Sequence, residues 1–314
     1  MTYTSSTSSQ STTHTCECGC GESTTRRFAR GHDVRMKAEL KRRWREGRDL
    51  SALNELRTRG WLDNVKETRK FGVEIEFLVP SQLHLSSLAM EMTARGLTCG
   101  IEGYNHNDVN YWKITTDSSV GGSGSTAGWV GRELVSPPLS SKEGKRQLRL
   151  ACEALAAVGA KVNMTCGLHV HHDARHLTDT AMVRVAETMA EFAWDMDRMV
   201  SKSRRGGNTY CYRFDRYQLD MIRAIGLRMY MQSSSRYQTL NLSAYLRHGT
   251  IEFRQHQGSV EYDKIVAWVE VGQAMIRAAQ RGDSLVGVSF GDLLEWGTRR
   301  LAWWERRIEV LNPA

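Results

Sequence analysis

The sequence lacks the long apolar segment that a membrane-spanning helix needs. No run among its 314 residues approaches the ~20 consecutive apolar residues that cross a bilayer. The N-terminus is rich in Ser and Thr and has no apolar core segment, so we expect no secretory signal. These absences argue against a membrane partner and favour a cytoplasmic location.

The sequence also lacks a pattern of cysteines typical of a disulfide-bonded protein. Its seven cysteines cannot all pair within one chain. Three are crowded together, and the others are scattered at Cys99, Cys152, Cys166 and Cys211. This distribution favours reduced thiols in a cytosol over a disulfide framework.

Several motifs that would assign a function are missing. The Gly/Ser-rich segment over residues 120–131 is not followed by G-K-[ST], so it is a linker or a lid and not a phosphate-binding P-loop. No RNA-recognition or helix-turn-helix signature is present. The formal net charge of +8 nevertheless favours an anionic partner, either nucleic acid or a phosphorylated small molecule.

The first 65 residues differ in composition from the rest. Residues 1–14 are Ser, Thr and Gln with almost no apolar side chains, and we expect them to be disordered. Residues 15–65 are predicted to form a basic helical appendage that contains Cys16, Cys18, Cys20 and His32. Thiolates and an imidazole at this spacing predict a small zinc site. The alternative is a flexible tail with redox-active thiols.

Two short helices are predicted in this appendage, over residues 37–48 and 51–59. The first is dense in Lys and Arg. A solvated face explains such a run, and a contact with nucleic acid or protein is the other interpretation. We therefore treat the segment as an appendage to a functional core that begins near residue 70.

Residues 71–78 (FGVEIEFL) alternate as a β-strand does. Val73, Ile75 and Phe77 form an apolar side, whereas Glu74 and Glu76 share the other. Like charges on one strand face repel each other unless a positive group lies between or above them. A divalent cation would be such a group, and a solvent-exposed face that carries two Glu by chance is the alternative.

Two later segments show the same alternation. In residues 167–173 (GLHVHHD) the polar side holds His169, His171 and Asp173. In residues 250–256 (TIEFRQH) we expect Glu252, Arg254 and His256 to share one face. Such groups bind divalent cations and phosphates. If the three strands are neighbours, they form a charged floor.

Other segments could complete this floor. Residues 132–136 are predicted to be a strand whose Glu133 faces the same way. Arg204 and Arg205 lie in a loop over residues 201–214, and Arg236 begins a strand predicted over residues 236–242. These arginines are candidates for contacts with phosphate.

The remaining pattern predicts an α+β fold. Helical apolar spacing occurs over residues 82–95, 142–158, 179–200 and 261–279, and short strands are expected near residues 97–102 and 111–116. The strands over 236–242 and 250–256, joined by a turn at His248 and Gly249, imply antiparallel pairing. Residues 70–314 therefore form one domain, a curved antiparallel sheet backed by helices.

Four motifs, in this order and at these separations, resemble those of the amidoligase family: FGVEIEF, RELVSPPL, TCGLHVHHD and GTIEFRQHQGS. That family belongs to the glutamine synthetase/glutamate–cysteine ligase superfamily of carboxylate–amine ligases. The resemblance covers residues 70–280. It implies a catalytic domain like that of glutamine synthetase, with ATP and two Mg²⁺ or Mn²⁺ ions as cofactors.

The resemblance also implies roles for individual residues. Glu76 and Glu133 would bind one ion, and Glu74, His169 and Glu252 the other. His171 would lie toward nucleotide or substrate, and Arg254 would contact phosphate, with Arg236 and Arg204 as further candidates. A second acidic ligand of the glutamine synthetase type is not evident soon after Glu133.

The implied activity is ATP-dependent formation of an amide bond through an acyl phosphate. Its substrates would be a carboxylate and an amine, each a small molecule or a peptide, and an oligomer is compatible with it. Three alternatives stay open at this point. They are a phosphotransferase on the same scaffold, a zinc hydrolase using His169 and His171, which lacks the H-E-x-x-H helix, and a nucleic-acid-binding protein that uses the basic N-terminus.

Overall fold

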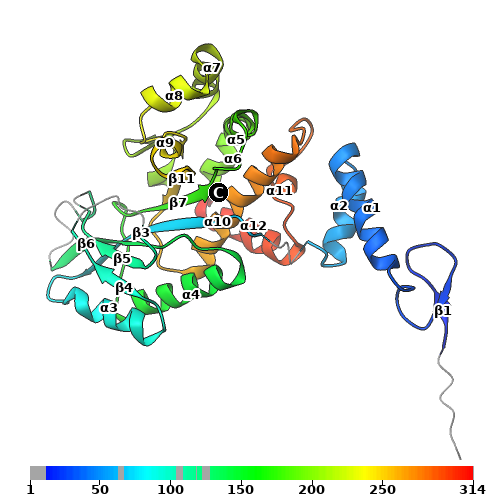
Figure 1. The fold of residues 1–314 in the computed structure, drawn as a ribbon, viewed down its shortest axis with the longest axis horizontal. Helices are drawn as coiled ribbons and strands as arrows, with labels where there is room; N and C mark the ends of the chain where they lie inside the picture. The colour runs from blue at the N-terminus through cyan, green and yellow to red at the C-terminus, as the bar shows by residue number, and fades with distance from the viewer. Residues whose placement is uncertain (1–11, 63–66, 104–108, 118, 122–127, 314) are drawn as a thin grey trace, which may run out of the picture. The chain divides into compact units, whose positions relative to one another are not determined.

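The computed structural model describes residues 12–62, 67–103, 109–117, 119–121 and 128–313 (Figure 1). Two compact units divide the chain. One comprises residues 1–64 with 295–301, and the other comprises residues 65–294 with 302–314. Most of the predicted disordered tail, residues 1–14, lies outside the described residues. Within the described part of the chain, no helix combines the length and apolar character needed to cross a membrane.

A seven-stranded sheet forms the centre of the larger unit. Its spatial order is β10-β11-β7-β3-β6-β5-β4. The strands span Phe71–Pro80 (β3), Cys99–Ile101 (β4), Trp112–Thr115 (β5), Trp129–Val135 (β6), Gly167–Asp173 (β7), Leu240–Asn241 (β10) and Thr250–Gln257 (β11). Neighbours pair antiparallel except β4 and β5, which are parallel. The predicted α+β class and helix-backed sheet are confirmed, although the sheet is mixed and not wholly antiparallel.

Helices pack on one face of this sheet because alternate strand residues are apolar. Val73, Ile75 and Phe77 of β3 are almost fully buried on that face. Helix α10 (Tyr262–Arg281) packs against β7 and also contacts α4 (Ser141–Ala157) and α5 (Asp179–Glu191). Helix α3 (Leu85–Ala94) packs against α4 and β4. The opposite face of the sheet is left for polar side chains.

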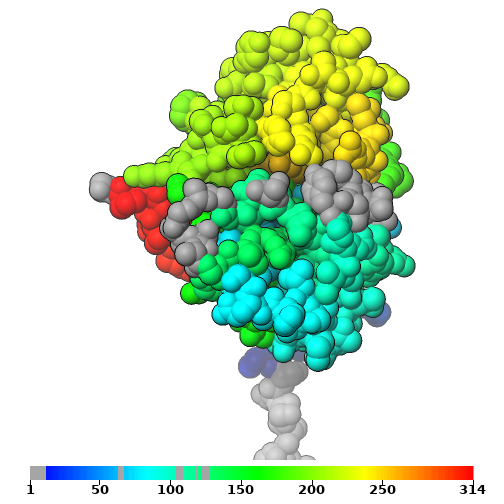
Figure 2. All heavy atoms as spheres, turned by 90° about the vertical axis from the view of Figure 1, so that its left-hand side faces the viewer, coloured from blue at the N-terminus to red at the C-terminus, as the bar shows by residue number. Residues whose placement is uncertain are grey.

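A second group of short elements lies between β7 and β11 in the sequence. They are α6 (Ala193–Arg198), the 3-10 helix η1 (Lys202–Arg204), β8 (Gly207–Asn208), β9 (Cys211–Tyr212), α7 (Arg216–Ile225), α8 (Leu227–Ser233) and α9 (Ala244–His248). In Figure 2 the segment containing α7–α9, coloured yellow-green to yellow, stands above the cyan and green-blue segments of α3 and β4–β6. The shorter helices α11 (Phe290–Leu293) and α12 (Thr298–Leu311) follow α10.

Three predicted elements in this region are wrong in detail. The helix expected over residues 179–200 is divided into α5 and α6 at Phe192. The strand expected over residues 236–242 is limited to β10, because the backbone N–H of Tyr212 donates to the carbonyl of Tyr237 and that of Thr239 donates to Tyr212. Helix α9, ended by Gly249 at a positive φ of 67°, lies where a simple turn was expected.

A bulge in β11 overturns the expected orientation of His256. The pairing with β7 is regular from Thr250 to Phe253, and then its register shifts before His256, which pairs with Leu168. A bulge adds one residue to a strand and reverses which face the following side chains occupy. His256 consequently joins the core side, where its ring lies 5.2 Å from that of Trp268 on α10.

The smaller unit is built on a pair of helices. Helices α1 (His32–Gly47) and α2 (Leu50–Thr58) pack together through buried Leu40, Trp44 and Leu53. The Asp49 side chain accepts hydrogen bonds from the first turn of α2 and caps it. The Trp44 indole N–H donates to Glu295 at 3.1 Å. Ahead of the helices, β1 (His14–Thr15) pairs with β2 (Ser23–Thr24).

Two histidines are enclosed in the core of the larger unit. His172 of β7 lies edge-on to Phe253, with ring centroids 5.5 Å apart, and a Cβ at Gly272 of α10 would come within 2.3 Å of its Nε2. Neither ring nitrogen of His172 has a hydrogen-bond partner among the described residues. Burial lowers the pKa of both His172 and His256 to about 3. Both are therefore neutral in the folded protein at pH 7.

As the pH falls below 6.5, the free energy of unfolding should decrease less in His172→Leu than in the wild type. The unfolded state protonates this histidine below its ordinary pKa of 6.5, whereas the folded state does so only near pH 3. Over that window one such group removes up to about 1.4 kcal/mol of stability per pH unit. His171, whose pKa is raised to about 9, is present in both the wild type and His172→Leu, so its contribution to the pH dependence cancels in the comparison.

Urea unfolding at pH 6.5 and pH 5 measures this effect. The difference in free energy of unfolding between the two pH values should be smaller in His172→Leu than in the wild type. The exposed His84 offers a matched control, because His84→Leu should leave the difference unchanged. An equal pH dependence in wild type and His172→Leu would contradict the assignment.

Candidate metal and phosphate site

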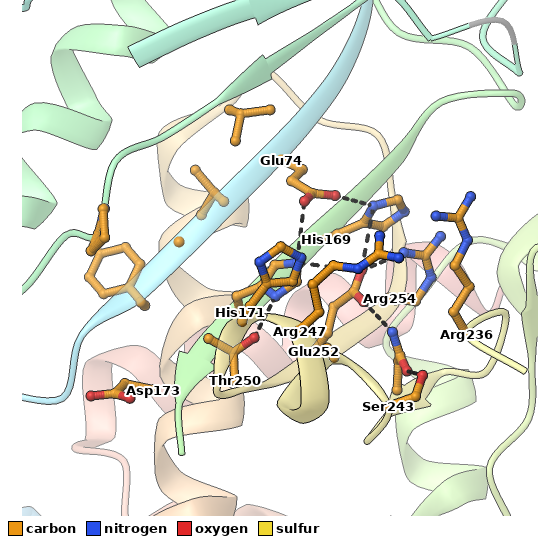
Figure 3. A pocket seen from close by; sticks show the side chains of 18 of the residues that line it. Glu74, His169, His171, Asp173, Arg236, Ser243, Arg247, Thr250, Glu252 and Arg254 are labelled. Carbon is orange, nitrogen blue, oxygen red and sulfur yellow. Dashed lines mark hydrogen bonds and ion pairs between the residues drawn. The ribbon is translucent and has the colours of Figure 1, made fainter. Parts of the chain in front are cut away.

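A pocket of about 1020 Å³ opens over the polar face of the sheet. Acidic and imidazole side chains from β3, β6, β7 and β11 line its floor, and arginines including Arg236 and Arg247 lie at its margin. Figure 3 shows Glu74, His169, His171 and Glu252 directed toward one another across three strands. This pocket brings together residues that are far apart in the sequence.

The register of the strands is what aligns these side chains. In the pairing of β3 with β7, Glu74 lies opposite His169. In the pairing of β7 with β11, His171 lies opposite Glu252. Residues directly opposite each other on one face are close enough to interact. A shift of one residue in either pairing would direct these side chains to the core.

The first group of possible metal ligands consists of Glu74, His169 and Glu252. Their donor atoms all lie within 4.8 Å of one another. His169 Nδ1 is 3.0 Å from a Glu74 oxygen and 3.8 Å from a Glu252 oxygen. His171 Nε2 lies 3.3 Å from Glu74 and 3.6 Å from Glu252, so it contacts the same two carboxylates.

The second group consists of Glu76, Glu133 and His169, again within 4.8 Å. Glu76 and Glu133 lie opposite each other in the pairing of β3 with β6. His169 Nε2 is 3.6 Å from Glu76, so the two ring nitrogens of this histidine face different groups. The backbone N–H of Gly167 donates to Glu76 and helps to fix its carboxylate.

The pKa values of Glu133 and Glu74 are shifted in opposite directions by burial and neighbouring charges. Burial, together with the Glu74, Glu76 and Asp117 carboxylates, raises the pKa of Glu133 well above its ordinary value. Burial would also raise the pKa of Glu74, but hydrogen bonds with His169 and His171 outweigh it and hold that pKa well below the ordinary value.

Burial and neighbouring charges also shift the pKa values of His171 and Glu252. Burial alone would lower the pKa of His171, but Glu252 and Glu74 outweigh it and raise the pKa to about 9. At Glu252 the effect of burial is overcome by Arg254 and His171, which lower its pKa. The site is therefore a mixture of carboxylates and cations that partly neutralise one another.

Arg254 is the predicted phosphate contact that lies nearest the floor. Its guanidinium pairs with Glu252, is largely buried and lines the pocket. Arg236 also lines the pocket, and its guanidinium carbon lies 5.0 Å from the centre of the Tyr237 ring. Both residues line the pocket, and their contact with phosphate stays a prediction.

The structure does not place the other two arginines in the same way. Arg204 is buried, and its guanidinium donates to the backbone carbonyl of Arg254 at 2.8 Å, so it supports β11 from the side. Arg205 is not among the residues that line the pocket. Its guanidinium donates to the carbonyls of Val200 at 2.9 Å and Leu311 at 3.1 Å, which directs it away.

Sequence reasoning missed three residues of the site. Lys113 of β5 is buried and lines the pocket. Asp117 is partly buried and also lines it. Alternation in residues 111–117 would have found both, since Trp112 and Ile114 occupy the core side. Asn241 donates to Glu252 at 2.6 Å and accepts from Ser243 at 2.6 Å, so it orients that carboxylate. No sequence signal marks Asn241.

The donor chemistry of both groups fits divalent cations. Carboxylate oxygens suit Mg²⁺ and Mn²⁺, and an imidazole nitrogen is acceptable to Mn²⁺. Three carboxylates that crowd the buried Glu133 also create the negative potential that a cation relieves. The observed clustering therefore fits the ions that the resemblance implied.

Comparison with known proteins identifies the class. Residues 67–276 match the family model described as "Putative amidoligase enzyme". Because the match covers more than half of the chain, the protein belongs to this amidoligase family, and the resemblance noted in the sequence is confirmed. No curated protein matches the sequence.

Solved structures give a looser likeness. One match is the crystal structure of the complex between prokaryotic ubiquitin-like protein Pup and its ligase PafA. The identity is 12%, the match covers 73% of this chain and 50% of that chain, and the TM-score is 0.33. This chain thus spans about half the length of the solved chain. A likeness of this kind does not bear on the activity of this protein.

The close approach at Gly167 generates a prediction about the second group. A Cβ at this position would lie 2.9 Å from Arg204 Nη2, 3.0 Å from His169 Nε2 and 3.3 Å from Glu76 Oε2. Gly167→Ala should displace these groups and weaken Mn²⁺ binding roughly tenfold or more, as do changes in the groups that orient metal ligands. Isothermal titration with Mn²⁺ measures the effect.

Gly207 provides the control for this substitution. A Cβ at Gly207 would meet nothing within 4 Å, so Gly207→Ala should bind Mn²⁺ as the wild type does. Circular dichroism should show folded protein for both variants. If folded Gly167→Ala binds Mn²⁺ with unchanged affinity, His169 and Glu76 do not form the Mn²⁺ site.

Proposed function

We propose that this protein is an ATP-dependent carboxylate–amine ligase that forms an amide bond through an acyl phosphate. Membership in the amidoligase family supports a ligase. The single observation that carries the finer proposal is the convergence of two carboxylate groups on the shared His169, beside Arg254, which lines the pocket. A site of this composition suits a reaction in which a phosphoryl group is transferred.

The chemistry explains why ATP is needed. A carboxylate is a poor acyl donor because its oxygen is a bad leaving group. In the first step a carboxylate oxygen attacks the γ-phosphorus of ATP, the bond to the β-phosphate oxygen breaks, and ADP leaves. In the second step the amine nitrogen attacks the acyl carbon, the carbon–oxygen bond to phosphate breaks, phosphate leaves, and the nitrogen loses a proton.

The two groups of ligands have separate assignments. Glu76 and Glu133 would hold one divalent ion, and Glu74, His169 and Glu252 would hold the other. When bound, such ions neutralise the charge of the phosphoryl oxygens. Asn241 holds the Glu252 carboxylate in place through its hydrogen bond.

The cationic residues supply binding and orientation. Arg254 and Arg236 line the pocket and would contact phosphate oxygens, and one such contact stabilises the complex by about 1.5–3 kcal/mol. His171, with its pKa raised to about 9, carries a positive charge at pH 7 beside Glu74 and Glu252. Arg204 acts through the backbone of Arg254, so its role is positioning.

The partners follow from the chemistry. The substrates would be a carboxylate and an amine, each borne by a small molecule, a peptide or a protein. The pocket is large enough to hold both a nucleotide and an acyl donor. A cytoplasmic location and contact of nucleic acid or protein with the basic helix α1 remain predictions from the sequence.

The proposed reaction is tested by product formation. Purified protein is incubated with ATP, Mg²⁺ or Mn²⁺, and paired pools of amino acids and peptides, and mass spectrometry searches for a condensed product with release of ADP. ADP release that requires both a carboxylate and an amine is expected. A phosphorylated product that does not react with hydroxylamine, and that accumulates in place of an amide when amine is present, would instead identify the phosphotransferase alternative and refute the ligase.

Changing the metal-binding carboxylates should abolish the reaction. Glu76→Gln and Glu252→Gln each keep the size of the side chain but remove a negative charge. ATP turnover is expected to fall by at least about 10²–10³-fold, the scale for losing one preorganised electrostatic contact. Release of ADP is followed by a coupled assay.

A matched control separates this effect from a general loss of charge. Glu143 lies exposed at the start of α4, so Glu143→Gln should keep wild-type turnover. All three variants should remain folded by circular dichroism. Turnover like that of the wild type in either Glu76→Gln or Glu252→Gln would show that the assigned carboxylates do not serve the reaction.

A further inference from the structure

A second cluster of potential metal ligands lies in the smaller unit, and the proposed reaction does not use it. Cys16, Cys18 and Cys20 follow β1, and His32 is the first residue of α1. One donor atom from each of the four lies within 4.8 Å of the others. His32 Nδ1 faces all three sulfurs, at 3.7 Å from Cys16 and 3.3 Å from both Cys18 and Cys20.

These distances are close to those of a tetrahedral zinc site. With Zn–S near 2.3 Å and Zn–N near 2.0–2.1 Å, tetrahedral geometry places sulfur and nitrogen ligands about 3.5 Å apart and two sulfurs about 3.8 Å apart. The Cys16 and Cys18 sulfurs are 3.3 Å apart. A small outward movement of one sulfur would admit the ion without rearrangement of the backbone.

The surroundings of the cluster supply independent support. The second ring nitrogen of His32, Nε2, lies 3.5 Å from the Glu22 carboxylate. A carboxylate on the far side of a ligating imidazole fixes its orientation and tautomer, as in many zinc sites. Nδ1 is then the nitrogen left for the metal, and it is the one that faces the sulfurs.

Backbone groups also hold the sulfurs in place. The N–H of Ala29 donates to Cys16 Sγ at 3.2 Å, and the N–H of Glu22 donates to Cys20 Sγ at 3.5 Å. Cys16 is almost fully buried, at 2% exposure. Sulfurs that accept such hydrogen bonds are suited to the thiolate form that binds metal.

The segment that carries these cysteines has few buried apolar side chains. Phe28 lies against Trp61 with ring centroids 6.0 Å apart, and Arg59 pairs with Glu17 at 3.0 Å. Between residues 12 and 31, Cys16 and Ala29 are the buried residues of apolar type. Arg27 pairs with Glu17, and both side chains are largely exposed, at 61% and 39%. Exposed ion pairs contribute about 0–1 kcal/mol. A metal would therefore add stabilisation that this small amount of apolar burial does not supply.

We propose that Cys16, Cys18, Cys20 and His32 bind one Zn²⁺ as a closed, structural site that ties residues 12–31 to the start of α1. All four positions are filled by protein ligands, so no position is left for a substrate or water. The ion stabilises the fold of the smaller unit. The proposal is independent of the ligase reaction, because none of these residues lines the pocket.

Cobalt substitution of the full-length protein tests the proposal. Co²⁺ bound to three thiolates and one imidazole gives a thiolate-to-cobalt charge-transfer band and the strong visible bands of tetrahedral Co²⁺. One equivalent of Co²⁺ should produce both, and Zn²⁺ should displace it. The charge-transfer band reports only on thiolates, so Co²⁺ at Glu74, His169 and Glu252 does not contribute to it.

Matched variants assign the ligands. Cys18→Ser and His32→Gln should each weaken Zn²⁺ binding at least tenfold and remove or shift the charge-transfer band. Cys99→Ser and His14→Gln should bind as the wild type does, since both residues lie outside the cluster. Equal Zn²⁺ binding in wild type and Cys18→Ser would overturn the proposal.

A measurement on the wild type covers the case in which a variant fails to fold. Removal of zinc with a chelator should expose residues 12–31 to limited proteolysis, and Zn²⁺ without Mg²⁺ should restore protection. Proteolysis that is unchanged by chelation, or recovery of Cys16, Cys18 or Cys20 in disulfides from freshly purified protein, would refute the structural zinc site.

Discussion

The concentration of carboxylates on one face of the sheet is the constraint on which the rest of the larger unit depends. Glu74, Glu76, Glu133 and Glu252 lie on four strand positions that share this face, and all but Glu74 are buried. Burial, and after it the repulsion between these like charges, raises the pKa of Glu133. The surrounding cations reduce the repulsion, with His171 between two carboxylates and Arg254 against Glu252. The result is a buried acidic site whose donor atoms suit divalent cations.

Apolar packing on the opposite face of the sheet stabilises the strands that carry these carboxylates. The same strands that carry carboxylates on one side carry Val, Ile, Phe and Leu on the other, and helix α10 approaches closely enough at Gly272 for contact with His172. Rigid packing behind the sheet holds the strands in register, and the register holds the ligands opposite each other. Small changes of backbone geometry have large effects here, as the bulge in β11 shows. It turns His256 into the core beside Trp268, whereas Glu252 and Arg254 before it remain on the polar face.

The two units are stabilised by different kinds of interaction. The larger unit buries an apolar core extensive enough to support a charged face, whereas residues 12–31 of the smaller unit bury almost no apolar surface. The helices α1 and α2 have their own core around Trp44, whereas in the segment ahead of them sulfur, imidazole and backbone N–H groups converge on one point. Small segments of this kind gain order from local polar chemistry because hydrophobic burial is insufficient.

The family, the α+β class and the strand faces of the main site residues could be predicted from local patterns, because strand alternation and ordered motifs depend on local chain geometry. These residues are Glu74, Glu76, His169, His171 and Glu252. Local patterns did not determine the bulge that turns His256, the helix α9 within the last hairpin, or the partners of Arg204 and Arg205. Those depend on which backbone groups find hydrogen-bond partners across distant segments. Strand alternation could have predicted that Lys113 and Asp117 lie on the polar face, but it could not have identified Asn241. Asn241 faces Glu252 because β10 pairs with β11 in the folded chain, and no local pattern foretells that long-range pairing.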